Sequence, residues 1–100
     1  MQVAHTSLFR RSYRSLQEGE RRRIDKCLRL FMVKPHGPYT AGLRPHKLGG
    51  QTGTPSKAGE KPPPIWEMHA SDNLLVTFQF GADEVVFRNC GHHADVIRCP

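Results

Sequence analysis

Residues 65–97 restrict the possible folds more than any other part of this 100-residue chain. They contain three β-type runs, at 65–70, 74–80 and 84–90. The short polar segments between them, SDN at 71–73 and GAD at 81–83, are typical of turns that join antiparallel strands. The sequence therefore predicts a three-stranded antiparallel meander.

One face of this meander needs a cover. The run 74–80 places an apolar residue at every even position, namely Leu74, Val76, Phe78 and Phe80. Two predicted helices, at 8–16 and 20–33, can supply the cover. In the second helix the apolar residues follow a helical period: Ile24, Cys27, Leu28, Phe31 and Met32. Cys27 is accordingly expected to be a buried thiol, and Thr6 or Ser7 can cap the first helix.

The remaining segments complete a single domain over residues 1–100. We predict short strands at 2–5 and 43–48, and a flexible loop at about 49–64, where apolar residues are almost absent. The predicted order is β-α-α-β-β-β-β. The fold class is therefore α+β, with an N-terminal helical hairpin packed on a small, mostly antiparallel sheet.

The charge is unevenly distributed along the chain. Residues 1–50 contain eleven Lys or Arg against three Asp or Glu, whereas residues 51–100 contain four against six. The basic half indicates a polyanionic partner, with nucleic acid first, although a solvated basic helix surface gives the same pattern. Three cysteines without a CxxC pair predict neither a disulfide framework nor a zinc knuckle. No apolar run approaches the ~20 residues that span a bilayer, so we expect a cytoplasmic protein.

Titratable side chains gather where the predicted strands end: His69, Asp72, His92 and His93. Such positions allow side chains to converge on a substrate. Each residue also has an ordinary structural explanation, since aspartate is favoured in turns and exposed histidines are common. A metal site built from five donors is a further alternative (His46, His69, Cys90, His92 and His93). Their spacing matches no metal-ligand signature, so we predict no metal and no other cofactor.

Four segments together resemble a known family. LRPHKLGG (43–50) resembles the GLR-x-H-x-L-x-G segment of the RelE/ParE superfamily, the toxins of type II toxin–antitoxin systems. Trp66 and Glu67 resemble the W-E strand that follows it. LLVTF (74–78), placed after the SDN turn, resembles the D-x-L-L-I-Y strand of the YafQ-like branch. RNCGHHADVI (88–97) resembles the terminal R-T-G-T-H-x-x-x-F of that branch.

The resemblance implies a RelE-like fold and a small ribonuclease that cuts messenger RNA in the ribosomal decoding site. The YafQ-like functional positions correspond to His46, His69, Asp72 and His93. Two positions depart from that branch, because Asn73 stands in place of Trp and Ile97 in place of Phe. We retain both as expected substrate contacts.

Cleavage of RNA without metal needs a base for the 2′-hydroxyl, an acid for the departing 5′-oxygen and positive charge for the transition state. We predict His93 as the acid, and His69 or Asp72 as the base. His46 is expected to hold the phosphate or stabilise charge. Arg44, Lys47 and Arg88 are candidate phosphate contacts.

Two other functions remain open. The chain could be a ParE-like toxin that inhibits DNA gyrase without nuclease chemistry, or an inert relative that binds nucleic acid. The expected partners of the nuclease are a cognate antitoxin, mRNA on the ribosome and ribosomal RNA, the last through the basic helices. No membrane partner is expected.

Overall fold

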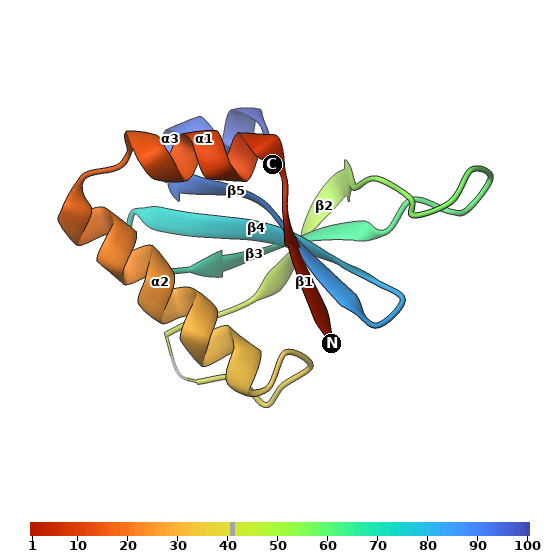
Figure 1. The fold of residues 1–100 in the computed structure, drawn as a ribbon, viewed down its shortest axis with the longest axis horizontal. Coiled ribbons are helices and arrows are strands. Elements are labelled where there is room, and N and C mark those ends of the chain that lie inside the picture. The colour runs from red at the N-terminus through yellow and green to blue at the C-terminus, as the bar shows by residue number, and fades with distance from the viewer. Residues whose placement is uncertain (41) are drawn as a thin grey trace.

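An antiparallel meander forms the centre of the sheet, as the two polar turns predict (Figure 1). The computed structural model describes residues 1–40 and 42–100. The sheet has five strands in the order β1-β5-β4-β3-β2. Among the strand pairs of the described residues, only β1–β5 is parallel. Its strands are β1 (Gln2–His5), β2 (His46–Thr52), β3 (Pro64–His69), β4 (Leu74–Gly81) and β5 (Glu84–His92).

The two predicted helices form the hairpin that covers one face of the sheet. These are α1 (Ser7–Ser15) and α2 (Glu18–Val33), and Figure 1 shows them joined by a short link. Thr6 caps α1, since its hydroxyl accepts a 3.0 Å hydrogen bond from the amide of Phe9. Cys27 is buried as predicted, and burial raises the pKa of its thiol to about 12.

The two faces of the sheet differ in chemistry. On the helix-covered face, Met68, Val76 and Phe78 pack in one cluster with residues of α1 and α2. Successive residues of a strand point to opposite sides of the sheet. The strand neighbours of Met68, Val76 and Phe78 therefore lie on the other face, which we call the polar face. The buried polar side chains of the sheet lie there: Glu67, Thr77, Gln79 and Asn89.

A short C-terminal helix, α3 (His93–Arg98), covers part of the polar face. Behind it, the carbonyl oxygen of Cys99 accepts a 2.8 Å hydrogen bond from Asn89. The carbonyl of Pro100 accepts one of 2.9 Å from Thr77. These contacts attach the end of the chain to the sheet.

The predicted α+β class is confirmed, and two local features differ from the prediction. Strand β2 runs from His46 to Thr52 rather than over 43–48, so the first part of the predicted loop is strand. The connection at 53–63 projects from the body of the molecule (Figure 1). Helix α3 follows β5 where no helix was predicted. Within the described residues, no helix has the length and apolar character needed to cross a membrane.

Candidate active site

The pairing of β2 with β3 places His46 directly opposite Glu67. Nε2 of His46 lies 3.4 Å from Oε1 of Glu67. The Glu67 side chain is buried and that of His46 is about half exposed. Both side chains lie on the polar face, because Met68, the neighbour of Glu67, packs against the helices.

His69 joins this pair from the same strand, two residues after Glu67. The ring centroids of His46 and His69 are 6.2 Å apart. The ligand atoms of His46, Glu67 and His69 all lie within 4.8 Å of one another. Among the described residues, Nδ1 of His69 is buried and has no hydrogen-bond partner. Burial lowers the pKa of His69 below its usual 6.5, and the positive charge of Arg44 lowers it further. Both effects favour the neutral form of the His69 ring.

The backbone just before β2 contacts both histidines. The carbonyl of Leu43 accepts a 2.7 Å hydrogen bond from the backbone amide of His69. The carbonyl of Arg44 lies 3.1 Å from Nδ1 of His46, and since a carbonyl can only accept, this nitrogen is the donor. Arg44 adopts a left-handed backbone with φ of 45°, which is uncommon for a residue other than glycine. With Nδ1–H directed at the carbonyl of Arg44, Nε2 of His46 faces Glu67.

The β3–β4 turn brings the C-terminal candidates to the same end of the sheet. The carbonyl of Asn73 accepts a 3.1 Å hydrogen bond from the backbone amide of His93, the first residue of α3. His93 also contributes to the lowered pKa of His69, as a nearby positive charge does. Asp72 and His69 line one cavity of about 580 Å³. The cavity is bordered by three cationic side chains: Arg23, Lys26 and Arg44.

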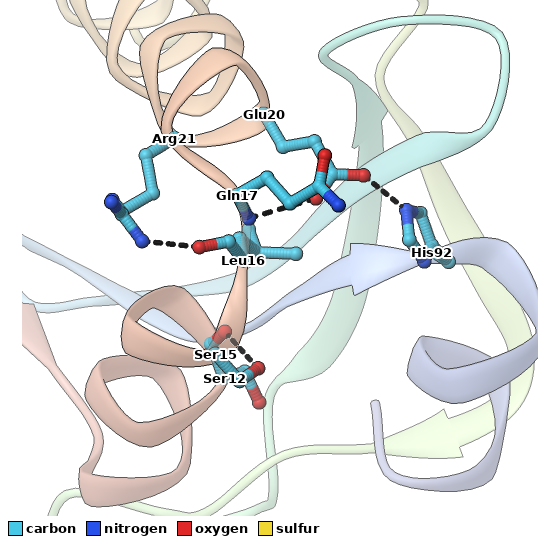
Figure 2. A network of polar contacts seen from close by, with 7 residues as sticks. All are labelled: Ser12, Ser15, Leu16, Gln17, Glu20, Arg21 and His92. Atoms are coloured by element: carbon cyan, nitrogen blue, oxygen red, sulfur yellow. Dashed lines mark hydrogen bonds and ion pairs between the residues drawn. The ribbon is translucent and has the colours of Figure 1, made fainter.

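A contact from α2 fixes the start of α3. One carboxylate oxygen of Glu20 accepts a 2.9 Å hydrogen bond from the backbone amide of Gln17, and the other lies 2.5 Å from Nε2 of His92 (Figure 2). Both contacts lower the pKa of Glu20, the bond from Gln17 most. Arg21 donates to the carbonyl of Leu16 in the same link between the helices (Figure 2). His92 is thereby held directly before His93.

The structure does not bring every predicted substrate contact to this group. The ammonium of Lys47 lies 5.4 Å from the ring centroid of Trp66. The guanidinium of Arg88 is bound by Gln79 at 2.7 Å, and its Nε donates to the carbonyl of Pro100 at 3.2 Å. Arg88 thus holds the polar face together, and its role as a phosphate contact stays a prediction. Ile97 lies one helical turn after His93 and is 52% exposed.

Glu67 is the residue that the prediction missed. The sequence contains a signal for it, because Glu67 is a charged residue between the apolar Trp66 and Met68. The five-donor metal set considered from the sequence is not assembled. Burial raises the pKa of the Cys90 thiol to about 12, and this thiol donates to the carbonyl of Phe9 in α1. His92 pairs with Glu20.

No family model matches the chain, and no curated protein matches it in sequence. Several solved structures share its fold. YafQ of Escherichia coli BL21(DE3) is 14% identical, with 94% of each chain covered and a TM-score of 0.66. A chain of the RelB–RelE antitoxin–toxin complex of Methanococcus jannaschii is 14% identical, with 98% of this chain and 100% of that chain covered, and a TM-score of 0.67. The YoeB/ParE toxin of Agrobacterium tumefaciens is 13% identical, with 93% of this chain and 99% of that chain covered, and a TM-score of 0.64. The chain therefore has the fold of the RelE/ParE superfamily of toxins, as the sequence resemblance predicted.

Proposed function

We propose that the chain is the toxin of a type II toxin–antitoxin system, and that it cuts messenger RNA on the ribosome without a metal. The observation that carries this proposal is the meeting of His46 and His69 beside a cavity that Asp72 lines. Cleavage through the 2′-hydroxyl requires an acid and a base close to the reacting bond. The end of β3 and the turn after it supply such groups.

The lowered pKa of His69 supports its role as the base. A neutral imidazole can accept the 2′-hydroxyl proton, and a pKa below 6.5 keeps the ring neutral at cellular pH. His93, held at the start of α3, is the proposed acid for the 5′-oxygen. His46, with its ring centroid 6.2 Å from that of His69, is proposed to hold the phosphate or to stabilise charge. Asp72 is the alternative base.

The charge around the cavity suits a phosphate backbone. Arg23, Lys26 and Arg44 border it, and each of these side chains is exposed. The exposed arginines of α2 extend the basic surface, which suits ribosomal RNA. Asn73 and Ile97 remain proposed contacts to the substrate, because each lies within one helical turn of His93 or is bonded to it.

A protein partner also fits the surface. The groove between α1 and α2 has a volume of about 310 Å³ and contains Phe9, Tyr13 and Leu28, with Arg10, Arg14 and Asp25 beside them. An apolar floor beside two arginines and one aspartate suits an antitoxin segment that carries apolar and acidic side chains. The RelE of the similar archaeal structure is bound to its antitoxin RelB. With these partners, the cytoplasm is the proposed location of the protein.

The proposal is tested by expressing the chain in a bacterial host and following growth together with the 5′ ends of mRNA. Wild type is expected to arrest growth and to produce new cuts within reading frames. His69→Ala and His93→Ala are each expected to lower cleavage by about 10²- to 10⁴-fold, the usual contribution of one acid–base group. His36→Ala is the matched control, since His36 is exposed and stacks on Phe80 instead.

Other outcomes decide against the proposal. Growth arrest without cuts in both wild type and the histidine variants would favour a gyrase-directed toxin. Unchanged nucleic-acid binding without toxicity in any variant would favour an inert binding protein. Cuts that persist in His69→Ala and His93→Ala would remove both residues from the mechanism.

A further inference from the structure

His46, Glu67 and His69 have the chemistry of a metal site as well as that of a nuclease. Two imidazoles and one carboxylate form the donor set found in many catalytic zinc sites. Oxygen-only ligands are what Mg²⁺ and Ca²⁺ prefer, so this set selects against them. We propose that the three residues bind a zinc ion, and that the bound ion inhibits RNA cleavage by occupying the two histidines.

The orientation of His46 supports this inference. Its Nδ1–H donates to the carbonyl of Arg44, so in the neutral ring the lone pair is on Nε2. A histidine that binds a metal commonly donates its other N–H to a carbonyl in this way. The lone pair then faces Oε1 of Glu67 at 3.4 Å. Two electron-pair donors at this distance need a positive charge between them, either a proton on His46 or a metal ion.

The spacing agrees with zinc. Bonds of about 2.0–2.1 Å to a tetrahedral ion place two ligand atoms about 3.3 Å apart. The His46–Glu67 pair already has this separation, at 3.4 Å. The three donors lie within 4.8 Å of one another, so a shift of the His69 ring by less than about 2 Å completes the site.

The surroundings favour an ion that is held but remains accessible. Glu67 is 5% exposed, so its carboxylate is poorly solvated. In the part of the chain that the structure describes, Nδ1 of His69 is a buried ring nitrogen without a partner. His46 is about half exposed, which leaves a route for an ion to enter. Three protein ligands leave a fourth position open, as in catalytic zinc sites.

Binding is tested by titrating the metal-free full chain with zinc chloride in a calorimeter. We expect one ion per chain for wild type, and no comparable binding of magnesium. Loss of a group that only orients a ligand costs about 10- to 100-fold in metal affinity. Removal of a ligand itself, in His46→Ala, His69→Ala or Glu67→Gln, is therefore expected to cost at least about 100-fold.

The controls separate this site from other donors and from unfolding. His36→Ala removes an exposed histidine outside the site, and Cys99→Ser removes the exposed thiol. Both are expected to bind zinc like wild type. Glu67→Gln keeps the size of the side chain, and circular dichroism checks the fold of each variant.

Replacing zinc by cobalt gives a second readout, because visible absorption bands of a four-coordinate ion should appear in wild type and be absent in Glu67→Gln. Zinc affinity that is unchanged in Glu67→Gln, or lost in Cys99→Ser, would overturn the assignment.

The second part of the proposal, inhibition of RNA cleavage by bound zinc, rests on the proposed nuclease function and is measured separately. Cleavage of mRNA on purified ribosomes is expected to fall at least tenfold with one equivalent of zinc and to return after chelation. If zinc leaves cleavage unchanged or raises it, inhibition is wrong while the calorimetry still decides binding. If the metal-free protein does not cleave at all, the nuclease proposal and this second part fail together, and the zinc site stands or falls on the titration alone.

Discussion

The two faces of the sheet are built from the same strands but on different principles. On the helix-covered face, Phe31, Phe78 and Phe87 meet in one aromatic cluster, with Phe31 and Phe78 centroids 4.7 Å apart. On the polar face, the buried side chains of Thr77, Gln79 and Asn89 are held by specific hydrogen bonds, and the candidate active site lies at one end. Burial of apolar surface tolerates approximate matching, whereas buried polar groups need correctly placed partners. Stability is therefore concentrated on one face and chemistry on the other.

The largest effect is expected on the helix-covered face. Phe78→Ala removes a fully buried ring from the aromatic cluster and leaves a cavity. Such changes cost about 3–5 kcal/mol, so the free energy of unfolding in urea should fall by that amount. Exposed Val33→Ala on α2 is the control and should leave stability nearly unchanged. If Phe78→Ala lowered the free energy of unfolding by less than about 1 kcal/mol, the helix-covered face would not be the main source of stability.

A smaller effect is expected from a polar residue on the other face. The side chain of Gln79 accepts hydrogen bonds from Arg88 and from the amide of Thr54, and donates to the carbonyl of Thr54. Gln79→Ala leaves these groups without partners, so unfolding free energy should fall by about 1–3 kcal/mol. Gln79→Met keeps most of the volume, so equal losses in both variants would show that hydrogen bonds dominate over packing. Wild-type stability in Gln79→Met would show the reverse.

The smallest expected effect is a loss of folding stability at acidic pH. It involves one histidine from each face of the sheet. Burial lowers the pKa of His5, which packs on Phe9 and Phe87, and that of His69. In both cases the unfolded chain takes up a proton near pH 6.5, before the folded protein does. Folding stability should therefore fall as pH drops below 6.5 towards each folded pKa. Urea unfolding at pH 7.5 and pH 5.5 measures this loss.

The variants His5→Gln and His69→Gln divide this loss between the two faces. Each should reduce the acid sensitivity in part, and the double variant should reduce it further. Only His69→Gln should change the rate of RNA cleavage, because His69 is the proposed base. If His5→Gln shifted the acid limb of the cleavage rate as strongly as His69→Gln, the separation of stability from chemistry would be incorrect.

Local patterns were enough to predict the helix-covered face. The helical period from Ile24 to Met32 and the alternation from Leu74 to Phe80 are repeated signals, and both lead to the observed core. Helix α3 has six residues, too few for a period to show. Strand β2 continues to Thr52 through exposed residues at the edge of the sheet. Its pairing relies on backbone bonds that no side-chain pattern reports.

The candidate site could be predicted only in part, since it depends on pairing between distant strands. His46, His69, Asp72 and His93 were identified from a resemblance, and their roles stay predictions. Glu67 becomes notable only when the β2–β3 register places it opposite His46. A register shift between Thr77 and Phe78 leaves Arg88 unpaired in β5. The guanidinium of Arg88 then binds Gln79, and no local pattern in the sequence gives this position.

The spacing of β3 limits how a gene for this fold can gain or lose codons. Glu67 and His69 share a face because they are two residues apart. Insertion of a single codon between them would turn one of the two side chains into the apolar core. The connection at 53–63 lies outside the strands and can change length at little cost. Divergent descendants should therefore accumulate insertions and deletions in that connection, while the interval between these two codons stays constant.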